Sequence, residues 1–448
     1  MKVIQFEDKP LAHYSYAIIS GNEMALVDPA RDPKPYYQLA EKHHATIKAV
    51  FETHPHADFV SSHLQIHHET GAKIYVSKLV GANYKHETFD DGKTITLGKV
   101  VFSAINSPGH SPDSITILAV DAKNNHAMFS GDTLFIGDVG RPDLREKAGN
   151  MKAKREELAK SMYHTMQTKF NHLPDTTIVY PAHGAGSLCG KNMSLDSQST
   201  LGRERKENWA FKNMAEEQFV NHILKDQSFI PSYFGFNVDI NKTGANNFNS
   251  DFCRIPFQFR ITTFIPDSNV IVDVRKASDF KENHLKGSIN IIAETEDDKL
   301  ETWLGSIIAP NEGFHLVINS VNDLNTILSR IAKIGYEKQI QSIITLGTKR
   351  FETFKDLDLK DFKNNPEKFT IIDIRNKSEV AESKIFEKAI SIPLHELRNS
   401  KDKIPTNKPI VVHCAGGYRS AAGSSVISNI LENKTVYDLS DDVEQFKE

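Results

Sequence analysis

The sequence has few cysteines, no basic excess and no long apolar run. Its 448 residues include three cysteines, Cys189, Cys253 and Cys414. They are too few and too far apart for a disulfide framework or a cysteine-based zinc site, and they fit a reducing compartment. The formal net charge of −4 provides no basic surface for nucleic acid or anionic membrane. The N-terminal residues lack the apolar core of a signal peptide, and no run reaches transmembrane length. We therefore expect a cytoplasmic protein that binds neither nucleic acid nor membrane.

The length of the chain allows about three domains at roughly 100 to 200 residues each. Hydrophobic residues make up 39% and charged residues 25%, as in an ordinary globular protein. Two stretches have the spacing of amphipathic helices, and their methionines and aromatics read as core residues. The first carries Leu158, Met162, Met166 and Phe170, and the second carries Trp209, Met214, Phe219, Ile223 and Leu224. The polar segment 237–251 is expected to contain a domain boundary.

Chemistry in the first half centres on the run Thr53-His54-Pro55-His56-Ala57-Asp58-Phe59, which follows an apolar stretch, residues 47–51, that predicts a buried strand. Three later segments add polar groups: Ser107-Pro108-Gly109-His110, Gly131-Asp132-Thr133-Leu134 and Tyr180-Pro181-Ala182-His183-Gly184. In this order the four segments resemble the signature of the metallo-β-lactamase superfamily. The dinuclear members of that superfamily carry another metal-binding histidine where this chain has Phe59. The resemblance therefore favours one metal over two.

The metal set that the resemblance implies is His54, His110 and Asp132. Two histidines and one carboxylate on one face of an octahedron suit non-haem Fe(II) and O₂, whereas zinc hydrolases also use three protein ligands. The match from Gly131 to Asp143 looks like the persulfide dioxygenase branch rather than glyoxalase II, which implies one Fe(II) per chain. On this resemblance the residues that orient ligands or substrate are His56, Asp58 and His183.

Two further residues of the first half are candidates for substrate contact. Arg141 could hold an anionic substrate by a bidentate contact, although an exposed, solvated arginine fits the sequence nearly as well. Cys189 follows His183 in a glycine-rich segment. Its thiol could carry or resolve a persulfide, and a small residue packed in a loop is an equally good interpretation.

A second chemistry is predicted near the C-terminus. The β-branched run from Pro409 ends at Cys414, and a helical spacing of apolar residues follows from Ala421. A strand ending in cysteine, a glycine-rich loop and a helix start form an anion cradle, whose N–H groups stabilise a thiolate. The loop resembles that of a rhodanese, with Cys414 as the sulfur-carrying nucleophile and Arg419 closing it. The loop residues between them are Ala415, Gly416, Gly417 and Tyr418, one fewer than a phosphatase needs.

The C-terminal half reads as a tandem repeat. The segment Asn269 to Arg275 mirrors Phe369 to Arg375 about a hundred residues upstream. In the first copy Asn319-Ser320 stands where His413-Cys414 stands in the second, and the glycines and arginine are missing. Serine without an activating base is a poor nucleophile. We therefore interpret the first copy as inactive and useful for packing.

These observations predict an α/β multidomain chain. The expected domains are an αββα metallo-β-lactamase-like domain at 1–250, an inactive rhodanese-like domain at 251–355 and an active one at 356–448, the last two with parallel sheets. The whole resembles bacterial fusions of persulfide dioxygenase and sulfurtransferase. The resemblance implies oxidation of a low-molecular-weight thiol persulfide by O₂ to sulfite, and sulfur transfer through Cys414 to sulfite, giving thiosulfate. The implied biological role is sulfide detoxification. We expect the protein to form a homo-oligomer.

Two alternatives remain open from the sequence. A Zn-dependent thioester hydrolase of the glyoxalase II type with an appended sulfurtransferase would use the same fold and most of the same residues. A scaffold protein that only docks persulfidated partners would not need an intact loop from Cys414 to Arg419.

Overall fold

The computed structural model describes residues 1–144, 155–264 and 267–447. These residues form two compact units. Unit 1 contains Met1–Asp251 together with the short segment Ala332–Gly335, and unit 2 contains residues 252–331 and the chain from 336 onward.

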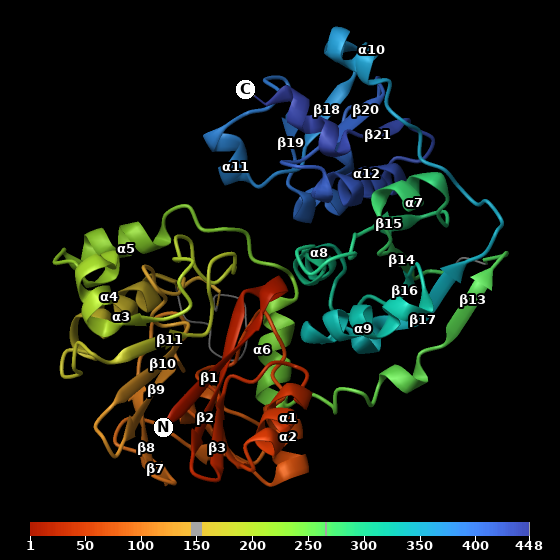
Figure 1. Ribbon diagram of the computed structural model, residues 1–448. Coiled ribbons are helices and arrows are strands. Elements are labelled where there is room, and N and C mark those ends of the chain that lie inside the picture. The colour runs from red at the N-terminus through yellow and green to blue at the C-terminus, as the bar shows by residue number, and fades with distance from the viewer. Residues whose placement is uncertain (145–154, 265–266, 448) are drawn as a thin grey trace. The chain divides into compact units, whose positions relative to one another are not determined.

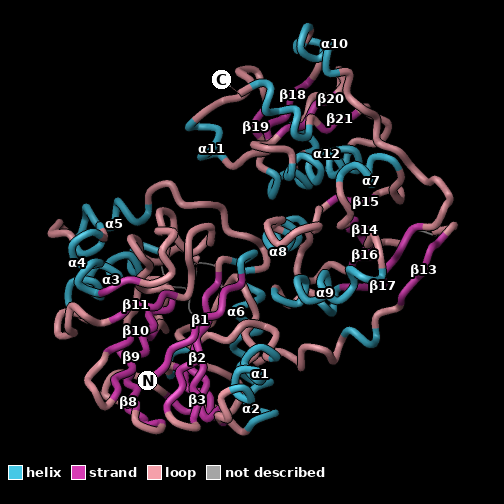
Figure 2. The backbone as a smooth tube through the Cα atoms, viewed as in Figure 1, coloured by secondary structure: helices cyan, strands magenta, loops and turns pink. Residues whose placement is uncertain are grey.

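Unit 1 contains two six-stranded sheets, some of whose strands are labelled in Figure 1, and strands are coloured magenta in Figure 2. The first has the order β1(Lys2–Asp8), β2(His13–Ser20), β3(Glu23–Val27), β4(Thr46–Phe51), β5(Lys73–Val76) and β6(Glu87–Thr88). The second has the order β12(Ser199–Thr200), β11(Ile178–Pro181), β10(His126–Gly131), β9(Ile115–Asp121), β8(Val100–Asn106) and β7(Thr94–Leu97). The helices are α1(Lys34–Lys42), α2(His63–Thr70), α3(Arg155–Thr168), α4(Leu201–Glu207), α5(Glu216–Leu224) and α6(Phe234–Thr243).

Three apolar clusters show that unit 1 has four layers. Side chains from both sheets, among them Phe51 and Phe129, form one cluster, so the sheets pack face to face. The outer face of the first sheet packs through Val50 on Tyr36 of α1. The outer face of the second sheet packs through Met128 on Met162 of α3. The predicted αββα arrangement is therefore confirmed, and Figure 1 shows α1 and α3 on opposite sides of the paired sheets.

Unit 2 contains two smaller, parallel sheets. One has the order β13(Phe257–Ile261), β17(Ile340–Leu346), β16(Phe314–Val317), β14(Val270–Asp273) and β15(Ser288–Asn290). The other has the order β19(Ile390–Ser391), β18(Thr370–Asp373), β20(Ile410–His413) and β21(Val436–Asp438). The helices are α7(Ala277–Glu282), α8(Leu300–Ile307), α9(Leu324–Lys333), α10(Leu359–Asn364), α11(Lys377–Glu382) and α12(Tyr418–Ile430).

The strand ladders align the two copies of the repeat and correct one sequence expectation. Asp273 of β14 lies opposite Val317, and Asp373 of β18 lies opposite His413. The residue that follows β16, Ile318, therefore occupies the position of Cys414, and Ser320 lies two residues further on. The first copy thus lacks the nucleophile more completely than the sequence comparison indicated, because an aliphatic side chain replaces the thiol.

One local expectation was wrong. The predicted helix from Trp209 to Leu224 is broken into a 3-10 turn, Trp209–Phe211, and α5. The break lies between them, where the backbones of Lys212 and Ala215 are extended. The boundary between the two units falls at the end of the polar segment 237–251, where the sequence placed a domain boundary, and α6 includes the buried Asn237 and Asn241 of that segment. Among the described residues, no helix is both long and apolar enough to cross a bilayer.

Candidate functional site

The loops that follow three buried strands bring together His54, His110 and Asp132. His54 follows β4, His110 lies between β8 and β9, and Asp132 follows β10 directly. The three side chains are buried, and their ligand atoms lie within 4.8 Å of one another. One oxygen of Asp132 lies 3.7 Å from Nε2 of His54 and 3.5 Å from Nε2 of His110. The three residues that the sequence predicted as metal ligands therefore face a common point.

The Nδ1 atoms of His54 and His110 both have hydrogen-bond partners, which leaves the Nε2 atoms directed at the common point. Nδ1 of His110 lies 2.9 Å from the Arg141 carbonyl, and Nδ1 of His54 lies 3.1 Å from the Thr53 hydroxyl. A carbonyl oxygen can only accept, so Nδ1 of His110 carries the proton and Nε2 keeps its lone pair. This is how metal-binding histidines are oriented. The residues present therefore fit one cation bound by two imidazoles and a carboxylate.

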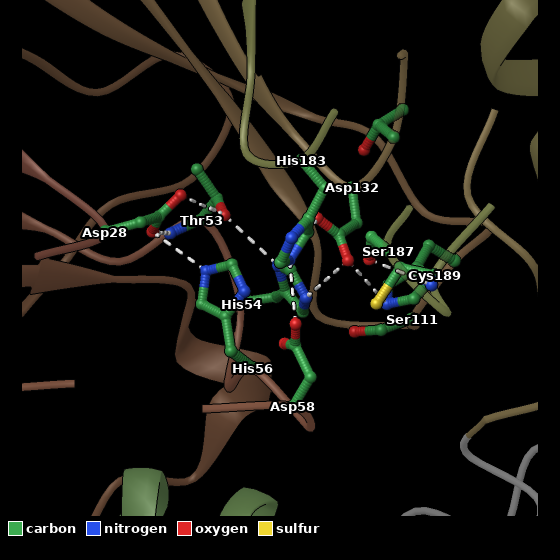
Figure 3. Close-up of polar contacts among 12 residues, drawn as sticks. Asp28, Thr53, His54, His56, Asp58, Ser111, Asp132, His183, Ser187 and Cys189 are labelled. Atoms are coloured by element: carbon green, nitrogen blue, oxygen red, sulfur yellow. Dashed lines mark hydrogen bonds and ion pairs between the residues drawn. The ribbon is translucent and has the colours of Figure 1, made fainter. Parts of the chain in front are cut away.

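Asp28 fixes the loop that carries the histidines (Figure 3). One carboxylate oxygen accepts from the Thr53 backbone N–H at 2.7 Å and the other from its hydroxyl at 2.8 Å. The first oxygen also lies 3.3 Å from Nε2 of His56. Asp28 adopts φ = 49°, an uncommon value for aspartate. Sequence reasoning missed Asp28, because it precedes the histidine motif by an entire helix and strand.

A second group, His56, Asp58 and His183, lies beside the first and could also hold an ion. Nε2 of His183 lies 3.4 Å from Asp58 and 3.6 Å from Asp132. Burial disfavours a charged imidazole here, but Asp58 and then Asp132 outweigh it and raise the pKa of His183 to about 10. Despite its own burial, Asp58 has a lowered pKa because of His183. Without a second ion, the group is an ion-paired cluster beside the metal ligands.

Phe59 closes the side of this cluster with a ring that has no donor atom. It is buried, and its centroid lies 3.8 Å from that of His13 and 4.5 Å from that of His56. Burial, followed by the charge of His183, holds the pKa of His13 well below its usual value. His13 is thus a neutral imidazole in contact with the site. Sequence reasoning missed His13, because it is the first residue of β2 and lies far from the histidine motif in the sequence.

Arg141 does not match either sequence interpretation. Its side chain is buried, and it donates from Nε and Nη2 to the two oxygens of Asp143 at 2.6 Å each. It also donates to the carbonyls of Leu188 and Ser228. A guanidinium committed in this way holds the surrounding loops rather than a substrate. The backbone of Arg141 still serves the site, since its carbonyl orients His110.

Cys189 lies where the sequence placed it as a candidate, beside the metal group. It is buried, and its Sγ is close enough to Asp132 and His183 to form a third possible ligand set. Burial, reinforced by Asp58 and Asp132, raises the pKa of the thiol well above its usual value. Figure 3 shows the Cys189 sulfur beside the Asp132 carboxylate.

Cys414 lies at the end of β20 in unit 2, and the chain turns there into α12. Its side chain is buried, and the Gly417 N–H donates to Sγ at 3.2 Å. Gly417 has φ = 93°, and a Cβ there would lie 2.7 Å from the Asp441 nitrogen. Only glycine fits this turn. The strand, loop and helix start that the sequence predicted are therefore present, with the Gly417 N–H directed at the sulfur, and Ala415 and Gly416 complete the loop.

The two residues that end the loop are held by neighbouring groups of unit 2. The Tyr418 hydroxyl donates to the Ile292 carbonyl at 3.0 Å. Arg419 donates from both terminal nitrogens to Glu379 at 2.7 Å each. Its guanidinium also lies over the ring of Trp303, 5.9 Å from the centroid. Ile292 and Trp303 both belong to the first copy of the repeat, so the first copy contacts the Cys414 loop of the second.

In the first copy, the residues that follow β16, at the position of the Cys414 loop, differ in charge and in residue type. A cavity of about 270 Å³ opens there, and its lining includes Ile318, the acidic residues Asp279, Glu294 and Asp323, and the basic residues Arg275 and Lys276. Counted from the strand end, Asp323 stands where Arg419 stands in the second copy. The charge at this position is therefore reversed, and an aliphatic side chain replaces the thiol.

Comparisons with known proteins agree with this division. The family model described as metallo-beta-lactamase superfamily matches residues 8–183. A crystal structure of a metallo-beta-lactamase from Staphylococcus aureus subsp. aureus COL is 30% identical, with a TM-score of 0.68, and the match covers 77% of this chain and 99% of that one. The chain belongs to the metallo-β-lactamase superfamily. This superfamily member also carries rhodanese-like domains, since the model of that description matches residues 264–344 and 358–448.

Curated relatives of the metallo-β-lactamase domain include proteins named for two different activities. The human mitochondrial persulfide dioxygenase ETHE1 is 31% identical over 166 residues, which cover 36% of this chain. The cytoplasmic hydroxyacylglutathione hydrolase of Arabidopsis thaliana is 33% identical over 177 residues, which cover 38% of this chain. The chain spans 59% of the length of the human protein and 63% of that of the plant protein.

Proposed function

We propose that this protein is a persulfide dioxygenase joined to a sulfurtransferase. The observation that carries the proposal is the convergence of His54, His110 and Asp132 beside Phe59, which has no donor atom. Two histidines and one carboxylate with open positions suit one Fe(II) per chain. The likeness to a protein named persulfide dioxygenase supports the same assignment.

The chain would perform this function with three domains, 1–250, 251–355 and 356–448, in a reducing cytoplasm. In the first reaction, one low-molecular-weight thiol persulfide, one O₂ and one water give one thiol, one sulfite and two protons. O₂ is the oxidant and the outer sulfur of the persulfide is oxidised. Iron held by His54, His110 and Asp132 would activate O₂ for this oxidation.

The chain's own residues prepare that site. Asp28 and Thr53 hold His54 and His56 in place, and the Arg141 carbonyl fixes the proton of His110. Phe59 and the neutral His13 exclude water from the side of the cluster. Asp58 and the protonated His183 form an ion pair next to the position where the anionic product would leave.

The second reaction would take place at Cys414. The Cys414 thiolate attacks the outer sulfur of a second thiol persulfide, whose sulfur–sulfur bond breaks and releases the thiol, so that Cys414 carries the persulfide. The sulfur lone pair of sulfite then attacks its outer atom. The sulfur–sulfur bond to Cys414 breaks, thiosulfate forms, and the thiolate remains on the protein. The Gly417 N–H at 3.2 Å and the start of α12 would stabilise that thiolate. Both reactions together would remove sulfide-derived sulfur.

A zinc-dependent thioester hydrolase is the second candidate. The likeness to a hydroxyacylglutathione hydrolase favours it, and so does the group His56, Asp58 and His183, which could hold a second ion. A docking scaffold has less support, because the contact between Gly417 and the Cys414 sulfur is a feature of reactivity rather than of docking.

Product analysis tests the proposal. The full chain given glutathione persulfide, coenzyme A persulfide or bacillithiol persulfide and O₂ should consume O₂ and accumulate thiosulfate. Cys414→Ser should leave O₂ uptake intact and change the product to sulfite. Arg419→Ala should act in the same direction but more weakly, since the backbone donors remain. Thiosulfate that still dominates in Cys414→Ser, after correction for uncatalysed condensation, would remove the coupled mechanism.

A further inference from the structure

Arg419, which ends the Cys414 loop, is already paired with a carboxylate. Its Nη1 and Nη2 donate to the two oxygens of Glu379 at 2.7 Å each, a bidentate geometry. Glu379 is itself held, because one of these oxygens accepts from the Asn376 N–H at 3.0 Å. This contact belongs to the capping box of α11. The position of the Glu379 carboxylate is therefore fixed by α11 and does not depend on Arg419 alone.

The guanidinium is also held independently of Glu379. It lies over the Trp303 ring, and the residue before it, Tyr418, donates to the Ile292 carbonyl. The exposed fraction of the side chain is 14% for Arg419 and 32% for Glu379, so both remain accessible from solvent. Removal of the carboxylate charge should thus leave the guanidinium near Cys414 rather than release it.

The Arg419–Glu379 pair reduces the positive charge that Arg419 presents to anions at the Cys414 loop. Burial opposes the charge on Arg419, yet Glu379 and then Cys414 raise its pKa, so the guanidinium interacts with both groups. In the proposed transfer to sulfite, a dianion approaches an anionic persulfide. An unpaired arginine would offset that repulsion, whereas an arginine neutralised by Glu379 offsets much less of it.

We propose that Glu379 is a specificity-determining residue, which acts as an internal counter-ion and competes with anionic reactants for Arg419. This rests on the proposed sulfur transfer at Cys414 for its biological meaning. Glu379 lowers the preference of the site for dianions such as sulfite relative to neutral thiols. An anionic acceptor reaches the persulfide when it displaces the carboxylate from the guanidinium.

The test compares two alkylating reagents of similar size and different charge. In the full chain, the rates at which iodoacetate and iodoacetamide modify Cys414 are measured by peptide mass spectrometry, which separates Cys414 from Cys189 and Cys253. Glu379→Gln keeps an oxygen for the capping box and removes the charge. The ratio of the iodoacetate rate to the iodoacetamide rate should rise by about threefold to tenfold, as expected when one nearby charge is removed. Glu382→Gln, an exposed residue of the same helix, should leave the ratio unchanged.

Kinetics with two acceptors extend the test to catalysis. In Glu379→Gln the KM for sulfite should fall, and the ratio of transfer to sulfite over transfer to dithiothreitol should rise. An alkylation ratio that stays constant or falls would overturn the proposal, because Glu379 would then only hold Arg419 in place. If the wild type transfers no sulfur to either acceptor, the proposed function fails, while the alkylation ratio still decides the role of Glu379.

Discussion

The side-chain amide of Asn241 donates to the backbone carbonyl of Phe59 at 2.8 Å. The same nitrogen donates to the His56 carbonyl at 2.8 Å, and the amide oxygen accepts from the Ser61 N–H at 2.8 Å. One buried side chain of α6 therefore holds three backbone groups of the loop that carries the histidines. The shape of the metal site depends on a residue about 180 positions further along the chain, a separation that these bonds span directly.

Replacement of Asn241 by leucine should weaken metal binding although all the proposed metal ligands are retained. Leucine has a similar volume but leaves the three backbone groups unsatisfied, which costs about 1–3 kcal/mol each in a buried setting, less where water enters. We expect a lower free energy of unfolding and faster loss of metal to a chelator, measured by urea titration and by metal content over time. Asn247→Ala, at an exposed position, is the matched control. Unchanged metal retention would show that the loop holds its shape alone.

Metal analysis should find about one iron per chain in the wild type. Alanine at His54, His110 or Asp132 should remove the metal and O₂ uptake together, because each supplies one of only three ligands. His56→Ala should weaken binding rather than abolish it. His164→Ala, on the exposed face of α3, should change neither. Two zinc ions per chain, thioester cleavage and no O₂ uptake would instead favour the hydrolase.

The inactive copy should not regain chemistry from a thiol alone. In a Cys414→Ser background, neither Ser320→Cys nor Ile318→Cys should restore sulfur transfer. Ile318 has the correct position after its strand, but the glycines that would aim N–H groups at a sulfur are missing, and Asp323 would repel an anion. Transfer at near wild-type rate by either double variant would show that the copy is dormant rather than inactive.

The pair Arg398–Glu312 should contribute pH-dependent stability to unit 2. Arg398 donates to both oxygens of Glu312 at 2.7 Å. Burial alone would raise the pKa of Glu312, but the arginine outweighs it, so the folded pKa lies below the usual value. The contribution is therefore complete above about pH 4.3, the usual glutamate pKa, and is lost as the pH falls through the lower folded value.

Glu312→Gln should accordingly lower the free energy of unfolding of unit 2 by about 1 kcal/mol at pH 7, and the difference should shrink in acid. Denaturant titrations across pH 3 to 7, with the exposed Glu367→Gln as control, measure it. A difference of the same size at pH 3 would mean that packing, not charge, explains the effect.

The resemblance of four motifs implied the metal group, and its members lie in loops that follow strands of the two sheets. For Cys414, a β-branched run, two glycines and a helical spacing predicted a loop between a strand and a helix. Neither argument could find Asp28, His13 or Asn241, whose contributions come from tertiary contacts with no local motif.

Two sequence errors concern local structure that residue types alone do not set. The alignment of Ser320 with Cys414 relied on residue types, whereas hydrogen bonds between strands set the register and place Ile318 there. The apolar spacing from Trp209 to Leu224 suited one helix, but the backbone is extended at Lys212 and Ala215, so the helix is interrupted there. In both cases, the backbone conformation decided the outcome and the pattern of side chains did not.

The reversed charge at Asp323 bears on how a duplicated module evolves. Recovery of a sulfur site in the first copy would need a cysteine, glycines and an arginine at once, and each change alone would bring no activity for selection to keep. The loss is therefore effectively one-way. The copy nevertheless remains under constraint, because Asn290 donates to Ser425 of α12, and the Ile292 carbonyl and Trp303 hold the working loop. We therefore expect the residues of the first copy that line the cavity beside Ile318 to vary among related proteins. We expect the residues that contact the second copy to vary less.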